Sequence, residues 1–430
     1  MQREMLIKIN NGDSFVALTE DRQLSEVYLP RQDRQNLLGN IYLGRVENVL
    51  PGMQAAFIDI GLAKNSFLYV EDALSPGQVA GTVPVGEDPK LRARSITDMV
   101  RRDQHVMVQI FKEPFGTKGA RVTMQPSLPG RYVVLLPKGD YIAVSRRIAD
   151  ETLRQQLKDL VRSHLPAGMG AIVRTVAADT DPETILADLR YLLSQWQCIQ
   201  EKAAKAAPPS LLYSDSDLLQ RVIRDTNGDD IDRILVGSKD EYDRVEDICN
   251  MVAPGLRSFL RLQETDDIFA DYDIYTQLER ALRRKVWLKS GGYIIFDQTE
   301  ALTAIDVNTG KYVGEDNLAD TVFKTNMEAV TEIARQLRLR NIGGIIIIDF
   351  IDMDNSEDRR KLLEALAEEV KNDRVRITVM GITQLGLVEM TRKKVGHSLS
   401  SVIEKECPTC AGRGRVMCVP LGKDKKDVCR

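Results

Sequence analysis

The feature that most constrains the fold is the run Ile345 to Phe350, which opens with four consecutive isoleucines. A nearly continuous apolar strand of this kind is typical of one buried on both faces of a sheet. Apolar residues at spacings near 3.6 predict a helix from about Asn317 to Leu339, and a second helix is expected over Ser356 to Lys371. With further strands expected at Ala301 to Asn308 and Arg376 to Met380, the alternation predicts a layered α/β domain.

The region Leu38 to Gln125 has a different character. Its short β-rich runs are separated by glycine and proline turns, which predicts a small barrel, and Ser75 to Arg102 is expected to be an exposed loop. Partial alternation over Met5 to Ser25 suggests a hairpin. The best internal boundary is Pro208-Pro209, which ends a helix that begins at Asp181-Pro182-Glu183, where aspartate suits the N-cap and proline the first turn.

Composition limits the class of function. A length of 430 residues suggests about three domains. With 63 acidic and 59 basic residues the net charge is −4, so a uniformly basic coat is excluded and a polyanion would need local basic patches. We expect no membrane-spanning segment and no secretory signal. Six cysteines do not make a disulfide framework, which indicates a cytoplasmic, reducing compartment, and three histidines argue against a centre built on several histidines.

Two aspartates stand at strand ends, where ligands bind in open α/β sheets. Asp349 ends the isoleucine run and Asp306 ends the preceding strand, while Asn308 shares a face with Asp306 because side chains alternate along a strand. Two carboxylates and an amide oxygen suit Mg²⁺ or Mn²⁺, which can activate water and neutralise charge at a phosphodiester. On spacing alone, each aspartate is equally well explained as a turn residue or a helix N-cap.

Other groups would suit an anionic polymer. In the barrel, Phe57 and Phe67 with Lys112 and Lys118 resemble the parts of an OB-type single-strand binder, although phenylalanine in a strand is more often core. Basic residues near the α/β block would fit the same ligand or be solvated helix faces. They are Arg283, Arg284, Lys285, Arg335, Arg338, Arg340, Arg374, Arg376, Arg392, Lys393 and Lys394.

Cys407 and Cys410 form a C-x-x-C in a glycine- and arginine-rich stretch. One such pair supplies two ligands, whereas a structural zinc needs four. The missing two would come from Cys418 and Cys429 or from a second chain. A thioredoxin-like redox role is the further alternative, but that motif opens a helix after a strand.

Together these segments resemble the ribonuclease E/G family of bacterial endoribonucleases over nearly the whole chain. The amino-acid sequences of these segments are more similar to the ribonuclease G branch of the family than to ribonuclease E. The matching blocks are Gly39 to Gly61, Gly116 to Arg121, Glu300 to Gly310, Arg335 to Met353, Leu385 to Lys394 and Glu406 to Val416.

The resemblance implies an Mg²⁺-dependent endoribonuclease that cleaves single-stranded RNA with a metal-activated water, leaving a 5′-phosphate and a 3′-hydroxyl. It implies stimulation by a 5′-monophosphate and work in rRNA and tRNA processing and in mRNA decay. The competing class is a non-catalytic S1-type RNA-binding protein, which would not need Asp306, Asn308 and Asp349.

Individual residues match the family's motifs. Asp306 and Asp349 match its metal-binding aspartates, and Asn308 matches the supporting asparagine. The residues that match its RNA-gripping positions are Phe57, Phe67, Lys112 and Lys118. Those that match its 5′-phosphate pocket are Gly130, Val134, Arg174, Thr175 and the buttressing Arg376.

The family architecture implies a multidomain α/β and α+β chain. Its parts are an RNase H-like subdomain in two pieces (1–37 and 216–279), an S1 domain of the OB type (38–125), a 5′-sensor region (126–215), a DNase I-like catalytic domain (280–400), a zinc link (401–416) and a tail (417–430). In the link, two protomers each donate Cys407 and Cys410 to one zinc, which makes a homodimer. The tail does not resemble the family's small C-terminal domain, so we expect most of that domain to be lacking.

Overall fold

The computed structural model describes residues 2–30, 37–73, 95–114, 118–215, 217–310, 318–405 and 407–410, with Gly412 and Gly414. Its contacts divide the chain into two compact units. The larger unit comprises Gln2–Val16 and Pro30–Ile268, and the smaller unit comprises Ala17–Leu29 and the described residues from Phe269 onward. Within those described ranges, no helix is both long and apolar enough to cross a membrane.

A five-stranded barrel lies in the larger unit, as the sequence predicted. Its strands follow the order β4-β5-β6-β8-β7, and pairing of β7 with β4 closes it. β6 and β8 run parallel and the other neighbours antiparallel, the arrangement of an OB-type barrel. The strands are β4 (Ile41–Leu50), β5 (Ala55–Asp59), β6 (Ser66–Tyr69), β7 (His105–Lys112) and β8 (Arg121–Thr123), and two short helices, α1 (Val70–Ala73) and α2 (Ile96–Met99), accompany them. Residues 75–94 of the expected exposed loop lie outside the described part of the chain.

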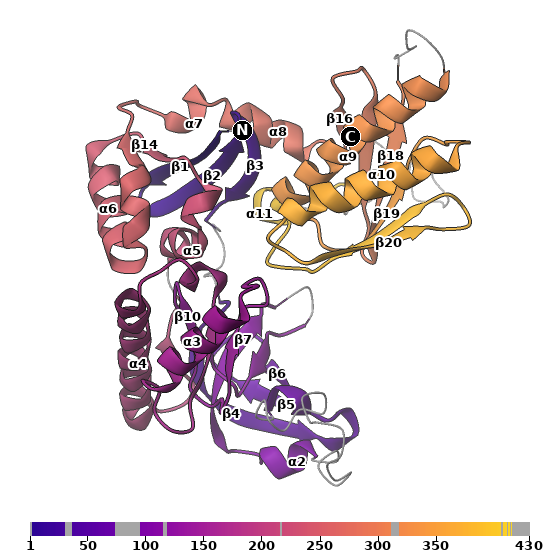
Figure 1. The fold of residues 1–430 in the computed structure, drawn as a ribbon. Coiled ribbons are helices and arrows are strands. Elements are labelled where there is room, and N and C mark those ends of the chain that lie inside the picture. The colour runs from indigo at the N-terminus through magenta and orange to yellow at the C-terminus, as the bar shows by residue number, and fades with distance from the viewer. Residues whose placement is uncertain are drawn as a thin grey trace. The chain divides into compact units, whose positions relative to one another are not determined.

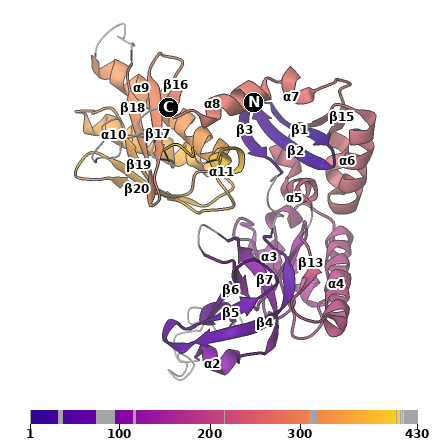
Figure 2. The ribbon, with the colours of Figure 1, turned by 180° about the vertical axis from the view of Figure 1, so that it is seen from behind.

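A small four-stranded sheet follows, in the order β11-β12-β10-β9. The long helix α4 (Pro182–Lys205) begins as predicted, because the Asp181 side chain accepts a hydrogen bond from the Thr184 N–H. Figure 2 shows α4 running alongside β13 (Ser210–Tyr213), which pairs with β4. The remaining elements are β9 (Leu128–Pro129), β10 (Val133–Leu136), β11 (Ile142–Val144), β12 (Gly170–Val173) and α3 (Glu151–Arg162).

The N-terminal strand β1 (Arg3–Asn10) pairs in parallel with β14 (Arg233–Val236), which pairs in parallel with β15 (Leu260–Leu262). The start of the chain and the segment after residue 217 therefore share one sheet, with α5 (Leu218–Asp225) and α6 (Lys239–Val252) nearby in the chain. Asn11 and Gly12 both have positive φ, which makes the tight turn that leads into β2 (Asp13–Glu20). The division between the units falls within β2.

The smaller unit is built on a six-stranded sheet with the order β16-β17-β18-β19-β21-β20. β18 and β19 are parallel neighbours, and the other pairs are antiparallel. Helices α9 (Leu318–Leu339) and α10 (Ser356–Glu369) lie across one face of this sheet (Figure 1). The strands are β16 (Lys285–Trp287), β17 (Tyr293–Gln298), β18 (Leu302–Asn308), β19 (Gly344–Asp349), β20 (Ile377–Ile382) and β21 (Val388–Arg392), and the unit also holds β3 (Gln23–Tyr28), α8 (Ile274–Leu282) and α11 (Leu399–Ile403), with α7 (Ile268–Asp271) at the division.

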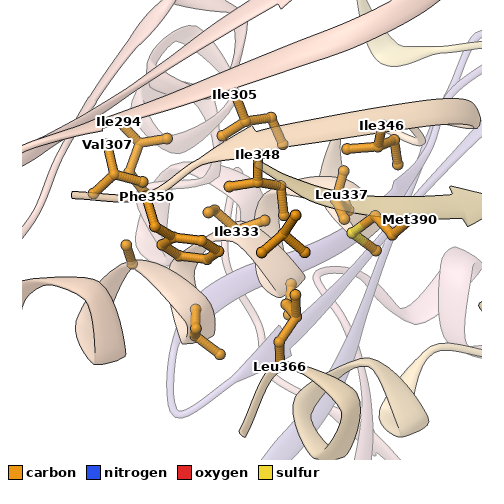
Figure 3. Close-up of a cluster of buried hydrophobic side chains, with 14 of the residues drawn as sticks. Ile294, Ile305, Val307, Ile333, Leu337, Ile346, Ile348, Phe350, Leu366 and Met390 are labelled. Carbon is orange, nitrogen blue, oxygen red and sulfur yellow. The ribbon is translucent and has the colours of Figure 1, made fainter. Parts of the chain in front are cut away.

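The core of the smaller unit lies between the sheet and the two helices (Figure 3). Ile346 and Ile348 of β19 are fully buried there against Ile333 and Leu337 of α9 and Leu366 of α10. The prediction that β19 is buried on both faces was wrong, because Ile345 is 52% exposed and Asp349 is exposed as well. Both helices cover the same side, which leaves the opposite side, here called the open face, accessible.

Candidate functional site

Asp306 and Asp349 are brought together by the parallel pairing of β18 and β19. The register places Asp306, two residues before the carboxyl end of β18, directly opposite Asp349, which ends β19. Their neighbours Ile305 and Ile348 are buried in the core, so both carboxylates point to the open face. The prediction of a shared strand-end site therefore has a geometric basis.

Asn308 joins the two aspartates. Its Nδ2 donates a hydrogen bond of 2.8 Å to Oδ2 of Asp306. The pKa of Asp349 is raised, first by burial and then by the negative charges of Asp306 and Asp352. Among the described residues, no ion pair neutralises Asp306, Asp349 or Asp352. The charge of Asp306 acts on Arg284, but that guanidinium is paired with Asp297, so the cluster keeps a net negative charge.

The alternative explanations of these aspartates fit less well. The N-cap of α10 is Asn355, whose side chain accepts from the Glu357 N–H, so Asp349 does not cap that helix. Asp306 lies inside β18, with two more strand residues after it. Paired carboxylates beside an amide suit Mg²⁺, which uses one or two carboxylates and keeps several waters. Within the part of the chain that is described, no three or more histidine, cysteine or acidic residues gather as a metal-binding group.

Phe57 and Phe67 lie opposite each other on β5 and β6 of the barrel. Their ring centroids are 5.0 Å apart and their planes 88° apart, an edge-to-face pair. Their neighbours Ile58 and Leu68 are the buried ones, so the two phenylalanines face outward. This favours a surface role over a place in the barrel core.

Sequence reasoning missed the residues that extend this aromatic surface. The Tyr69 ring lies 4.8 Å from that of Phe67, and the Arg121 guanidinium lies over the rings of Tyr69 (4.5 Å) and Phe111 (5.1 Å). Nε of Arg121 is held by Asp72 at 2.8 Å. The period-2 spacing of Phe67 and Tyr69 is the sequence signal that could have revealed their shared face.

The two predicted lysines are both exposed. Lys112 ends β7, where it pairs with Arg121 of β8. Lys118 lies in the connection between β7 and β8. Both ammonium groups are therefore accessible to an anionic ligand near the aromatic surface.

Gly130, Val134, Arg174 and Thr175 gather around the small sheet of the larger unit. Nη1 of Arg174 donates to the Gly130 carbonyl at 2.9 Å and to Oδ1 of Asp225 at 2.7 Å. The Thr175 hydroxyl lies 2.8 Å from that of Ser145, and Val134 of β10 pairs with Ile172 of β12. Arg376 belongs to the smaller unit, where its carbonyl accepts from the Lys393 N–H.

Asp225 and Asp188 organise this group, and neither was predicted. Burial acts to raise the pKa of Asp225, but the guanidinium groups of Arg224 and Arg174 outweigh it and lower that pKa. Asp188 accepts from the N–H groups of Tyr132 and Val133, and a Cβ on Gly130 would lie 2.5 Å from its Oδ2. Only glycine fits at position 130, which no local sequence pattern revealed.

Cys407 and Cys410 lie in a turn. Backbone N–H groups of Cys410 and Thr409 lower the pKa of the Cys407 thiol, and the Gly414 N–H donates to Sγ of Cys410 at 3.3 Å. The lowered pKa favours the thiolate of Cys407, the form in which cysteine binds zinc. Cys418 and Cys429 lie outside the described residues.

A closed OB-type barrel with outward aromatic rings, together with a carboxylate pair on a separate sheet, is an arrangement that suits an enzyme that cleaves nucleic acid. The sequence model of the Ribonuclease E/G family matches residues 127–395. Ribonuclease G of Escherichia coli strain K12 is 44% identical over 421 residues, covering 97% of this chain and 85% of that protein. Ribonuclease G of Haemophilus influenzae is 42% identical over 417 residues (97% and 84%), and ribonuclease E of Nostoc sp. is 41% identical over 419 residues (96% and 59%).

The chain belongs to the ribonuclease E/G family, as its motifs predicted, and it is an endoribonuclease.

Proposed function

We propose that this endoribonuclease depends on Mg²⁺, cleaves single-stranded RNA and is stimulated by a 5′-monophosphate, and that it acts in the cytoplasm in rRNA and tRNA processing and mRNA decay. The observation that carries the metal dependence is the pairing of Asp306 with Asp349 on the open face, where no described ion pair neutralises them. Bound there, Mg²⁺ would lower the pKa of water and neutralise charge on the phosphodiester. The test is cleavage of a 5′-monophosphorylated oligonucleotide with and without Mg²⁺, and undiminished cleavage in EDTA contradicts the proposal.

The chain's own residues have separable tasks in this scheme. Asp306 and Asp349 would hold the ion, and Asn308 orients the Asp306 carboxylate through its 2.8 Å hydrogen bond. The barrel, our proposed S1 domain (38–125), would bind the RNA. Residues 126–215 are proposed as the 5′ sensor and 280–400 as the DNase I-like domain. The parallel sheet of β1, β14 and β15 supports a composite RNase H-like subdomain from 1–37 and 216–279.

For RNA binding by the barrel, Phe57→Ala is expected to weaken the binding of single-stranded RNA by about 1–3 kcal/mol, because one base loses its stacking surface. Lys112→Ala should weaken binding, because one phosphate contact is lost. The slope of the logarithm of the binding constant against the logarithm of the salt concentration should then become shallower by about 1. Fluorescence anisotropy of a labelled single-stranded RNA at several salt concentrations measures both. Tyr191→Ala, which removes a 50% exposed aromatic from α4, is the matched control. Loss of the folded barrel in Phe57→Ala, seen by circular dichroism, would instead assign Phe57 to the core.

For 5′-end sensing, Arg174→Ala is expected to remove the faster cleavage of 5′-monophosphorylated RNA over 5′-hydroxyl RNA. Arg174 uses only Nη1 in side-chain hydrogen bonds among the described residues, so Nε and Nη2 remain to bind a phosphate. Asp225→Asn should reduce the same preference in part, because it loosens the guanidinium. Cleavage rates on the two RNAs measure the effect, with Arg190→Ala of α4 as control. Equal wild-type rates on both RNAs would exclude a sensor.

For the zinc link, we propose that Cys407 and Cys410 of two protomers hold one Zn²⁺ and so make a homodimer. The hydrogen bonds that favour the thiolate of Cys407 support zinc, and a tetrahedral site needs four ligands where one pair gives two. Native mass spectrometry should therefore find one zinc per two chains, and chelation should give monomers. Cys198→Ser, which removes an exposed cysteine elsewhere, should change nothing. A zinc-loaded monomer would rule out the shared link, and a metal-free dimer would rule out zinc altogether.

A further inference from the structure

An exposed tryptophan stands on the edge strand of the six-stranded sheet. Trp287 of β16 is 62% exposed, whereas the other tryptophan of the chain, Trp196, is 4% exposed in the core of the larger unit. A tryptophan left this accessible forgoes most of the free energy that its burial would contribute. Packing in the core of the smaller unit therefore does not explain why a tryptophan occupies position 287.

Trp287 belongs to a compact group with a lysine between two rings. It lies opposite Tyr293 in the β16–β17 hairpin, with ring centroids 5.5 Å apart. Nζ of Lys285 lies 3.9 Å from the Trp287 centroid and 3.5 Å from the Tyr293 centroid. Lys285 forms no ion pair within the described part of the chain, whereas its neighbour Arg284 is paired with Asp297. The group therefore offers π-faces and a positive charge that no carboxylate of the described residues neutralises in an ion pair.

Strand register connects this group to the acidic pair. Lys285 pairs with Ile295, Ile295 with Asp306, and Asp306 with Asp349, in one row across four strands. In the adjacent row, Trp287 pairs with Tyr293 and Tyr293 with Asn308.

Side-chain alternation places both rows on the open face. Ile294 and Phe296 of β17 point into the core, so Tyr293 and Ile295 point the other way. With neighbouring strands about 4.8 Å apart, the aromatic group lies about 10 Å from Asp306, roughly one to two nucleotides of an extended strand.

We propose that Trp287, Tyr293 and Lys285 form a stacking subsite for a nucleotide of single-stranded RNA next to the cleaved phosphodiester; this rests on the function proposed above. A base stacks on any aromatic face, and a lysine beside it meets the adjoining phosphate, which is how sequence-tolerant single-strand sites are built. RNA is favoured over an anionic membrane because the group offers one lysine beside two rings, which suits one phosphate and one base, whereas an anionic membrane surface is bound by a cluster of several basic residues. A second copy of the chain is the occupant that the test must exclude.

Tryptophan fluorescence tests the contact directly. The full chain without added Mg²⁺, where cleavage is not expected, is titrated with an unstructured oligoribonucleotide. Saturable quenching is expected in wild type and in Trp196→Phe, in which Trp287 is the only tryptophan. Trp287→Phe, which keeps the buried Trp196, should show none.

Steady-state kinetics then tests the role. Trp287→Ala is expected to raise KM about 5- to 150-fold with kcat nearly unchanged, which corresponds to the stacking energy of one base. Trp287→Phe should retain most of the affinity. Lys285→Ala should reduce the slope of log KM against the logarithm of the salt concentration by about 1, because one phosphate contact is lost. Met251→Ala, an equally exposed apolar side chain on α6, should leave KM unchanged.

The outcomes separate the two levels of inference. Wild-type cleavage with no quenching of Trp287 and an unaltered KM in Trp287→Ala overturns the subsite and leaves the proposed function intact. A wild type that neither cleaves nor binds the RNA overturns the proposed function itself. Fluorescence of Trp287 that changes with protein concentration alone, with a rise in sedimenting mass, assigns the group to self-association and also overturns the subsite.

Discussion

Asp349→Asn and Asp306→Asn should each slow RNA cleavage roughly a thousandfold or more while leaving RNA binding nearly unchanged. Each change keeps the side-chain shape and removes one of two adjacent negative charges on the open face. The charge that attracts a divalent cation is halved, so stabilisation of the phosphodiester transition state is lost. The proposed RNA-binding surface of the barrel is unaltered, since Phe57, Phe67 and Lys112 lie on other strands.

Single-turnover cleavage at saturating RNA measures the effect, and anisotropy without added Mg²⁺ measures binding. The matched control is Asp354→Asn, an exposed carboxylate a few residues after Asp349 and outside the pair. The raised pKa of Asp349 adds a second readout, because protonation of its carboxylate removes a metal ligand. At subsaturating Mg²⁺, cleavage should therefore fall on acidification at a higher pH than the ordinary pKa of an aspartate would give, because protons compete with the metal for the free carboxylate. Near-wild-type turnover in both variants would remove the acidic pair from the mechanism.

The sequence predicted the elements of the smaller unit because their patterns are local. The periodicity near 3.6 identified α9 and the isoleucine run identified β19. The alternation of side chains along a strand is also a local rule, and it predicted that Asp306 and Asn308 lie on one face. The pairing of Asp306 with Asp349 required the order of the strands in the sheet, which depends on contacts between distant segments.

Two features of the candidate sites could not be predicted from local sequence patterns. Both helices pack on one side of the sheet, so an all-apolar run such as Ile345 to Ile348 is open on its other side. The partner of Arg174 is Asp225, 51 residues away on α5, and nothing near either residue indicates the pair. The barrel was predictable as a closed sheet from its turns, but the platform of Tyr69, Arg121 and Phe111 depends on three strands.

The largest expected loss of stability follows removal of one partner of the ion pair between Arg392 and Asp373. Both side chains are 4% exposed, and Nε of Arg392 lies 2.7 Å from Oδ2 of Asp373. Nη1 of Arg392 also donates to Oδ1 of Asn341 at 2.9 Å and to the Ile342 carbonyl at 3.0 Å. Arg392 thus ties the end of β21 to the segments that follow α9 and α10. Removal of one charge leaves the other buried and unpaired, which costs about 3–5 kcal/mol.

Arg392→Met and Asp373→Leu should therefore each lower the free energy of unfolding of the smaller unit by that amount. Urea unfolding in a Trp196→Phe background isolates this unit, because Trp287 is then the only fluorescent tryptophan. Lys371→Ala, which breaks the exposed pair with Glu368, is the control and should change little, since exposed pairs contribute little. The double variant should be less destabilised than the sum of the two single variants, because no buried charge then lacks a partner. Additive losses, or losses no larger than that of Lys371→Ala, would show that the pair does not hold β21 beside β19, and the geometry of Asp349 would then need another support.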